Sequence, residues 1–283
     1  MAGKWSRTRR IIRLMATLLA EPGEIFSLGQ FAREMDVARS TISDDVRLIR
    51  DTAEAMGLGT VRTYAGATGG VQFFPDPSCK QDQLIRETLV NELSDPSRLL
   101  PGGFLYMTDI IFSPRWAEAI GVYFARLLAP REPDYIVTIE TKGIPLALMT
   151  ARAMNRPLVI IRRNYRVSEG SSVNISYVSG STTRIQTMSL PRRAVTPGSR
   201  AVVIDDFMRG GGTVAGARDL LSEFDVRVSG VAVVVSTRDP EIKRFGDYYA
   251  LVEVAQLSAE PTLTVRSIAP ELPVKNSRPP EGI

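Results

Sequence analysis

The sequence predicts an α/β protein of two domains: a small N-terminal domain of helices with a β-hairpin, and a larger domain built on a mostly parallel sheet. Helix-length apolar patterns and a glycine-rich turn fill the beginning of the chain, whereas further on short apolar runs alternate with helical patterns. Such alternation is typical of a parallel sheet covered by helices. The expected division is residues 1–74, residues 75–268, and a flexible tail of proline, charged and small residues over 269–283.

The composition fits a globular protein of a reducing compartment. The chain has 283 residues, of which 44% are hydrophobic and 23% charged, which is enough for two ordinary domains. It contains one cysteine and no histidine, so an intrachain disulfide, histidine-based catalysis and histidine zinc sites are excluded. No apolar run is long enough to span a bilayer. We therefore expect a cytoplasmic protein with no membrane partner.

In the N-terminal domain, apolar residues recur at helical spacing in three segments, and two strand-like runs then flank a glycine-rich tip. The expected elements are helices over 6–19, 28–35 (with Ser27 as N-cap) and 39–56, and strands over 61–64 and 71–74. A helix, a helix-turn-helix and a hairpin in this order are the layout of a winged-helix DNA-binding domain. A small helical dimerisation module is the alternative.

The charges of this domain indicate how it would meet DNA. Five bases between Lys4 and Arg13 precede the first acid, Glu21, and such a cationic arm suits phosphates, although a solvated helix face is an equal alternative. The acids of the third helix, among them Asp44 and Asp45, would repel phosphates if they faced the groove. The start of that helix is therefore expected to approach the bases. The predicted phosphate contacts are Arg7, Arg9, Arg10 and Arg62, and the predicted base contacts are Arg39, Ser40 and Thr41.

The second domain is expected to follow a β-α order. Its predicted elements are a linker at 75–78, helices over 80–94, 114–129, 144–154 and 214–224, strands over 135–140, 158–163, 201–205, 230–237 and 248–254, and a projecting hairpin over 175–190. Ligands of such sheets bind at the carboxyl ends of the strands.

The most informative segment is AVVIDDFMRGGGTVAGA at 201–217. An apolar strand ends in the acid pair Asp205 and Asp206, and a glycine-rich turn leads through Thr213 into a helix. Carboxylates suit ribose hydroxyls, while glycine backbone N–H groups and a helix N-terminus suit a phosphate. An ordinary strand-to-helix turn would explain the glycines but not the acid pair. The chain has neither a Walker A lysine nor a GxGxxG dinucleotide motif here.

A second anion site is indicated by the segment TIETKGIP at 138–145. Thr141, Lys142 and Gly143 follow an apolar strand and precede a helix, so they offer a hydroxyl, an ammonium and an accessible backbone N–H. Alone, this pattern is more typical of a helix cap with a solvated lysine. Upstream of the acid pair in the same β-α series, it matches the expected position of a pyrophosphate loop.

These motifs resemble the type I phosphoribosyltransferase fold, which binds 5-phosphoribosyl-1-pyrophosphate (PRPP). With FAREMDVARSTISDDVRLIRD in the N-terminal domain, and ETKGIPLA, SYVSGSTTRIQTMSLPRR and VIDDFMRGGGT in the second, residues 6–268 resemble the PurR-type purine operon repressors of Gram-positive bacteria. The resemblance implies a homodimer that binds double-stranded DNA upstream of purine genes. It also implies that PRPP, or a phosphorylated nucleotide competing for its pocket, acts as effector, with PRPP as the inducer that weakens DNA binding.

The resemblance also assigns roles to residues. Asp205 and Asp206 would hold the ribose hydroxyls directly or through Mg²⁺, Thr141–Gly143 would meet the pyrophosphate, and Tyr106 would cover the ligand unless it is a core residue. The implied PRPP loop is Asp205, Asp206, Phe207, Met208, Arg209, Gly210, Gly211, Gly212 and Thr213. The hairpin 176–190 with Arg184 matches a mobile loop of the enzymes. Arg209 stands where lysine is expected, so a planar fork replaces a point charge.

Two functions remain at this point. The preferred one is a repressor of purine biosynthesis and transport genes that senses PRPP, is not an enzyme and requires no cofactor. The alternative is an active purine phosphoribosyltransferase with a secondary regulatory role. The chain after Val254 offers no aromatic residue to stack a purine base before its tail, and the N-terminal domain favours the sensor.

Overall fold

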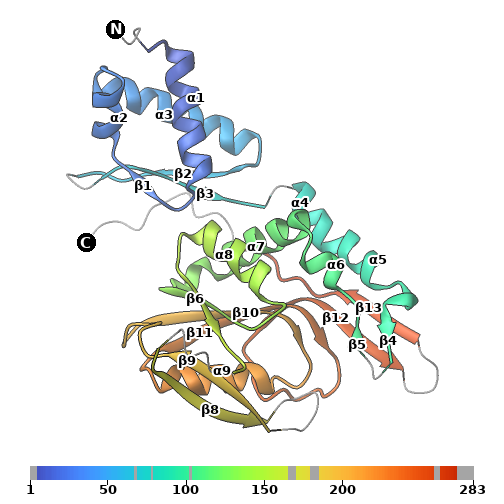
Figure 1. Cartoon of the computed structure of the whole chain (residues 1–283). Helices are drawn as coiled ribbons and strands as arrows, with labels where there is room; N and C mark the ends of the chain where they lie inside the picture. The colour runs from blue at the N-terminus through green and yellow to red at the C-terminus, as the bar shows by residue number, and fades with distance from the viewer. Residues whose placement is uncertain are drawn as a thin grey trace.

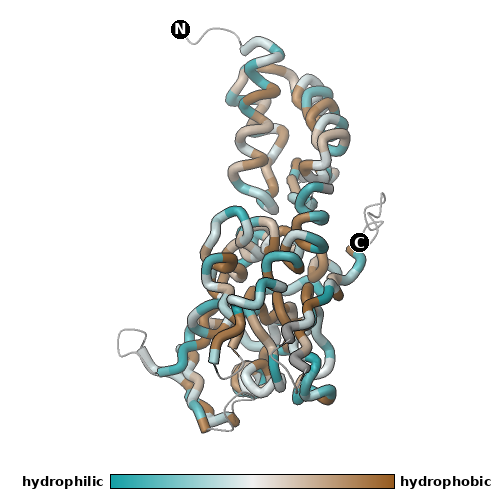
Figure 2. Tube along the Cα trace, turned by 90° about the vertical axis from the view of Figure 1, so that its right-hand side faces the viewer, coloured by the Kyte–Doolittle hydropathy of each residue, from teal (hydrophilic) through white to brown (hydrophobic). Residues whose placement is uncertain are grey.

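The molecule consists of two domains, one above the other in Figure 1. The computed structural model describes residues 5–66, 69–77, 79–101, 104–164, 170–178, 185–257 and 262–272. The view turned by 90° shows the helical N-terminal domain standing on the larger α/β domain (Figure 2). In the part of the chain that is described, no helix is long and apolar enough to cross a membrane.

The N-terminal domain has the expected helices and wing, with one strand more. Its elements are α1 (Arg7–Ala20), β1 (Ile25–Phe26), α2 (Leu28–Glu34), α3 (Arg39–Ala55), β2 (Gly59–Thr63) and β3 (Val71–Pro75). The apolar faces of the helices pack on Val61, Val71 and Phe73 of the wing. The short β1 pairs with β3, and its two residues were too few for a sequence pattern. Ser27 precedes α2 as predicted, although its side chain makes no capping hydrogen bond.

The α/β domain is built on a six-stranded sheet of order β13-β12-β11-β10-β6-β7, in which only β13 is antiparallel. The strands are β6 (Tyr135–Ile139), β7 (Leu158–Ile161), β10 (Arg200–Met208), β11 (Arg227–Thr237), β12 (Tyr249–Leu257) and β13 (Thr262–Ser267). The predicted mostly parallel sheet is confirmed. The antiparallel β13 was not predicted.

Helices and a hairpin cover the two faces of this sheet. The remaining elements are α4 (Cys79–Gln83), η1 (Leu84–Thr88), α5 (Leu89–Leu93), η2 (Pro96–Arg98), β4 (Leu99–Leu100), β5 (Phe104–Leu105), α6 (Thr108–Ile111), α7 (Pro114–Leu128), η3 (Ala129–Arg131), α8 (Ile144–Met154), β8 (Ser172–Val178), β9 (Ile185–Pro191) and α9 (Gly212–Ser222). Alternate residues of β10 face opposite cores: Val202 and Ile204 pack towards α7 and α8, and Ala201 and Val203 towards α9 and the β8–β9 hairpin.

The chain after β13 begins in contact with the folded domain. The carbonyl oxygens of Ala269 and Pro270 accept hydrogen bonds from the Arg86 guanidinium, at 2.9 and 3.1 Å. The Tyr123 hydroxyl donates to the Pro270 carbonyl at 2.6 Å. Main-chain carbonyls can be bound whatever their side chains are, so the first two residues of the predicted tail over 269–283 contact the domain, while the tail itself stays a prediction. Residues 273–283 lie outside the described part.

Candidate functional site

The acid pair lies at the carboxyl end of β10, in the middle of the sheet. Asp205 is aligned with Val233 of β11, and Ile204 before it with Thr138 of β6. The strand runs on to Met208, three residues beyond the predicted end. The sheet thus presents Asp205 and Asp206 at the edge where parallel sheets bind ligands.

Asp205 is a buried carboxyl group that lies beside a second acid, Asp206. Only 8% of the residue is exposed, and its Oδ1 accepts a hydrogen bond from the Asp206 N–H at 2.9 Å. Burial raises the pKa of Asp205 well above its usual value, and the Asp206 carboxylate raises it further. No cation of the described residues forms an ion pair with it. A ligand that brings hydroxyls or a cation would supply the missing partner.

The glycine-rich turn after β10 is held from behind by the segment after β11. Gly211 has a φ of +73° and directly precedes α9, a conformation that favours glycine. The Arg244 N–H donates to the Gly210 carbonyl at 2.9 Å, and a Cβ on Gly211 would lie 3.0 Å from the Phe245 nitrogen. Backbone N–H groups of the turn and the start of α9 can therefore bind a phosphate.

The loop before α8 approaches the acid pair closely. Gly143 directly precedes α8 (Ile144–Met154). A Cβ added to it would clash with Thr138 Oγ1 and lie 3.0 Å from Asp205 Oδ1. Thr138 Oγ1 is itself buried without a hydrogen-bond partner in the described structure. The two loops predicted separately from the sequence thus meet at one place.

One pocket of about 390 Å³ contains both loops. It is lined by Glu140, Thr141, Lys142, Arg163, Asp205, Asp206, Phe207, Met208, Arg209, Gly210, Gly212 and Thr213. Of the residues predicted for the effector, Gly143, Gly211 and Tyr106 are not in this lining. The first two shape the backbone of the loops. Tyr106 is 43% exposed, so the alternative of a buried core tyrosine is wrong.

Arg163 and Glu140 belong to the lining and were not predicted. The Arg163 Nε donates to the Glu140 carbonyl at 3.0 Å, and its Nη1 reaches Gln186 Oε1 of β9 at 3.4 Å. Arg163 comes shortly after β7 (Leu158–Ile161) and therefore lies at the same carboxyl edge of the sheet as Asp205. This position was a signal in the sequence that could have predicted it as a site residue. It adds a guanidinium opposite the acid pair, which suits a phosphate group.

The β8–β9 hairpin packs on α9 beside the pocket. The Tyr177 hydroxyl donates to Gln186 Oε1 at 2.7 Å, and a Cβ on Gly216 of α9 would lie 2.9 Å from the Tyr177 ring. The predicted hairpin is confirmed, and it packs on α9 instead of projecting freely from the sheet. Its turn, which includes Arg184, lies outside the described residues.

Most of the residues predicted for DNA lie on the surface of the N-terminal domain. Arg9, Arg39, Ser40 and Arg62 are exposed and Thr41 is half-buried. Arg39 is the first residue of α3, as expected for the end of a recognition helix. Arg62 lies on the wing with its guanidinium 4.8 Å from the centre of the Phe74 ring.

Arg10 is the exception, because it is buried in an ion pair. Its Nε donates to Asp45 Oδ2 at 2.7 Å and its Nη1 to the Trp5 carbonyl at 3.1 Å. Arg7 lies 3.4 Å from the other oxygen of Asp45 with its side chain 64% exposed. The structure therefore removes Arg10 from the surface that can meet phosphates. It also answers the concern about Asp45, which points into the domain and not towards DNA.

Comparisons with known proteins agree with this two-part architecture. Residues 6–75 match the family model "Bacterial purine repressor, N-terminal", and residues 113–260 match "Phosphoribosyl transferase domain". The chain is 40% identical over 255 residues to the purine biosynthesis transcriptional repressor PurR of Bacillus subtilis, which covers 90% of each chain. The chain belongs to the PurR family. Within the PurR family it is also 34% identical, over 89% of this chain and 93% of the relative, to a PurR of Lactococcus lactis named a transcriptional activator.

The second domain of this PurR family member has the phosphoribosyltransferase fold. Adenine phosphoribosyltransferase from Thermoanaerobacter pseudethanolicus superposes with a TM-score of 0.52 at 19% identity, over 58% of this chain and 99% of that one. At this identity the similarity concerns the fold alone. With the family matches it confirms the predicted fold class.

Proposed function

We propose that this chain is a DNA-binding repressor of purine biosynthesis and transport genes, and that PRPP binds its pocket as an inducer. The observation that carries the proposal is the meeting of two anion-binding loops and an acid pair in one pocket, in a chain whose N-terminal domain matches the bacterial purine repressors. PRPP has a phosphate, a ribose and a pyrophosphate, which are the groups that these three features suit.

In the proposed complex, each part of the pocket binds one part of PRPP. Gly210–Thr213 and the start of α9 hold the 5′-phosphate, and Asp205 and Asp206 hold the ribose hydroxyls. Thr141, Lys142 and Arg163 hold the pyrophosphate. The carboxylate oxygens also suit a Mg²⁺ ion that accompanies PRPP, and no separate cofactor is proposed.

On DNA, Arg39, Ser40 and Thr41 would approach base edges, while Arg7, Arg9 and Arg62 bind phosphates. Operators read by two winged helices favour a homodimer. PRPP and DNA are then coupled, and linkage requires that each weakens the binding of the other by the same factor.

A gel-shift titration tests the proposal. The probe is a duplex with the upstream region of a purine biosynthesis gene, titrated with and without PRPP. We expect PRPP to raise the Kd for DNA at least about fivefold, within the usual range of allosteric coupling. Equal DNA affinity with and without PRPP would contradict the role as inducer. Because one relative is named an activator, a reporter gene in a deletion strain decides the sign of regulation.

The alternative is an active purine phosphoribosyltransferase, which the match of residues 113–260 to the transferase domain favours. A transferase must hold a purine against the ribose, and residues 255–268 contain no aromatic side chain to stack it. Incubation with PRPP and each purine base distinguishes the two functions. Nucleotide formation at an enzymatic rate would support the transferase.

A further inference from the structure

Helix α8 joins the pocket to the DNA-binding domain. Its first residue follows Gly143, which lies against Thr138 and Asp205, as described above. Its last residue is followed by Asn155, which contacts the N-terminal domain. A helix of eleven residues moves approximately as a rigid body, so a displacement of its first residues also displaces its last residues.

The far end of α8 is fitted tightly to the turn between α1 and β1. A Cβ on Gly23 would lie 2.6 Å from the Asn155 Cβ and 3.2 Å from the Met154 carbonyl carbon. The Asn155 side-chain amide donates to Glu24 Oε2 at 2.8 Å. Asn155 has a φ of +49°. A side chain at position 23 would not fit, so the turn and the end of α8 lie close together.

The turn between α1 and β1 is also hydrogen-bonded to the wing. The Gly23 N–H donates to the Phe73 carbonyl of β3 at 2.7 Å, and the Gln72 amide donates to the Gly23 carbonyl. The Tyr64 hydroxyl then donates to Gln72 Oε1 at 2.6 Å. A displacement of Gly23 is therefore passed to β3 and to the wing.

The middle of α8 crosses α7 at a glycine. A Cβ on Gly121 would clash with the Met149 Cβ and lie 2.9 Å from the Thr150 nitrogen. The two helix backbones thus lie in close contact at Gly121, which is where a pivot of α8 would lie.

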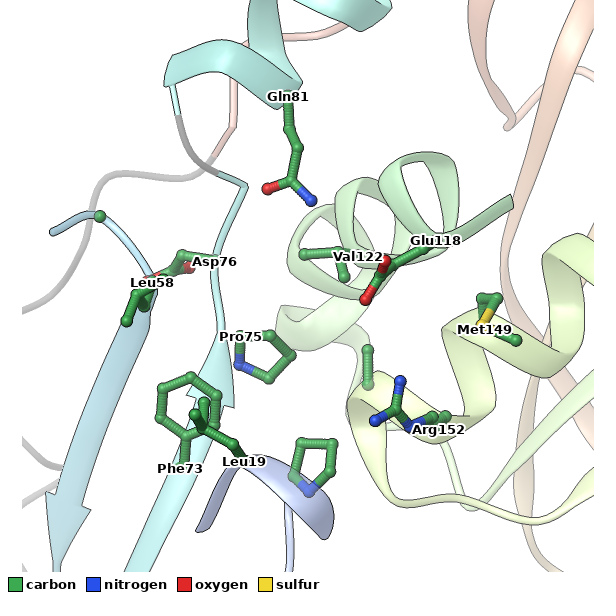
Figure 3. A pocket seen from close by; sticks show the side chains of 13 residues that line it. Leu19, Leu58, Phe73, Pro75, Asp76, Gln81, Glu118, Val122, Met149 and Arg152 are labelled. Carbon is green, nitrogen blue, oxygen red and sulfur yellow. The ribbon is translucent and has the colours of Figure 1, made fainter. Parts of the chain in front are cut away.

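The two domains also share a fixed contact and a cavity that leaves room for motion. Asp76, after β3, accepts from Thr60 at 2.8 Å and pairs with Arg126 of α7 at 2.9 Å. Between this contact and the Asn155–Glu24 contact lies a pocket of about 350 Å³. Figure 3 shows it between the wing strands and helices α7 and α8. Leu58, Phe73, Pro75, Val122, Met149 and Arg152 are among its lining residues.

We propose that α8 is a lever that transmits occupancy of the effector pocket to the wing, with its pivot at Gly121 and its output at the Asn155–Glu24 contact. The proposal rests on the function proposed above. Ligand binding displaces the loop at Thr141–Gly143, α8 turns on α7, and the N-terminal domain rotates about Asp76 into the cavity. Coupling of this kind needs an element with two arrangements that both sites favour differently.

The test removes the output contact and leaves both binding sites intact. In Asn155→Gly, the positive φ is retained while the amide and Cβ are lost; Glu24→Ala removes the acceptor. Glu24→Gln keeps an acceptor oxygen. Asp225→Gly is the matched control, because Asp225 also has a positive φ, of +56°, just after a helix of the same domain. PRPP affinity is measured by calorimetry without DNA, and DNA affinity by anisotropy with and without saturating PRPP.

We expect Asn155→Gly and Glu24→Ala to change each separate affinity less than about threefold and to reduce the effect of PRPP on the DNA Kd at least about fivefold. Glu24→Gln and Asp225→Gly are expected to respond like the wild type.

A full PRPP response in Asn155→Gly and Glu24→Ala overturns the proposed lever but not the proposed function. Loss of DNA binding by a folded Asn155→Gly without PRPP also overturns it, because the contact would then be needed for DNA binding itself. A wild type that binds PRPP without any change in DNA affinity overturns the proposed function and the lever together.

Discussion

Asp45 in the winged-helix domain and Asp205 in the α/β domain are both buried carboxyl groups with opposite surroundings. Asp45 has no exposed surface and receives the guanidinium of Arg10 at 2.7 Å. Within the described part of the chain, Asp205 accepts a hydrogen bond from the Asp206 N–H and lies beside the Asp206 carboxylate, and it forms no ion pair. The first carboxylate is satisfied within the fold, whereas the second is not.

The difference indicates which buried charge supports structure and which is kept for a ligand. Burying a charge costs free energy unless a partner compensates it. Asp45 has its partner in the same domain, so it fixes α1 on α3. Asp205 forms no ion pair among the described residues, and burial raises its pKa; residues with strongly shifted pKa values are typical of binding sites.

The largest effect is expected from breaking the satisfied pair. Arg10→Met would leave the buried Asp45 with only its 3.4 Å contact to the exposed Arg7, and loss of the buried partner costs about 3–5 kcal/mol. Urea unfolding measures this, with fluorescence of Trp5, whose carbonyl also contacts Arg10. The double variant Arg10→Met/Asp45→Leu should regain most of the lost free energy of unfolding.

Arg7→Ala is the control. Its side chain is 64% exposed, so its removal should cost below about 1 kcal/mol. Equal losses in Arg7→Ala and Arg10→Met would contradict the assignment of Arg10 to the core.

The next effect concerns the unsatisfied acid pair. Asp205→Asn/Asp206→Asn should weaken PRPP binding at least about 100-fold, which is about 2.7 kcal/mol, and leave DNA affinity unchanged. Calorimetry measures the first and anisotropy the second. The control Asp219→Asn/Asp225→Asn makes the same change in charge on exposed residues of the domain. Release of DNA by PRPP from the Asp205/Asp206 variant would show that the pocket is assigned wrongly.

A smaller effect is expected on the thermal stability of Asp205→Asn: the substitution weakens PRPP binding but should stabilise the folded chain. The pKa of Asp205 is higher in the folded chain than its ordinary value of 3.8, so the folded state favours the protonated carboxyl. The stability that Asp205 contributes is therefore fully present below pH 3.8 and is lost as the pH rises through the raised pKa. Asp205→Asn removes this loss and should raise Tm by a few degrees at neutral pH. The difference should shrink as pH falls towards 4. Thermal melts over this range measure it, and a lower Tm in the variant at neutral pH would contradict the argument.

The same comparison explains what the sequence could predict. The acid pair, the glycines and Thr213 are contiguous, so strand, turn and helix chemistry place them together without knowledge of the fold. The Arg10–Asp45 pair joins residues 35 apart, and the Arg163–Gln186 contact joins residues 23 apart. Such contacts depend on packing, which local patterns do not contain.

One signal for Asp45 was nevertheless present. Asp45 lies three residues after Ile42 and four before Ile49, on the buried stripe of α3. A carboxylate on that stripe predicts a cationic partner in the core. Which residue this partner is depends on how α1 packs on α3. The antiparallel β13 and the two-residue β1 depend likewise on pairing with distant strands.

The smallest effect separates the two arginines at the start of α1. Arg9 is exposed, whereas the Nε of Arg7 lies 3.4 Å from Asp45 Oδ1 and is partly engaged there. A lysine or arginine that neutralises one phosphate contributes about 0.9 to the slope of log Kd against log salt. Arg9→Ala should therefore reduce this slope by about 1 for any duplex, and Arg7→Ala by less, because Asp45 already competes for its charge. Anisotropy titrations over a range of salt concentrations measure both. An unchanged slope in Arg9→Ala would make the start of α1 a solvated helix face, and the phosphate contacts would then have to come from the wing and α3.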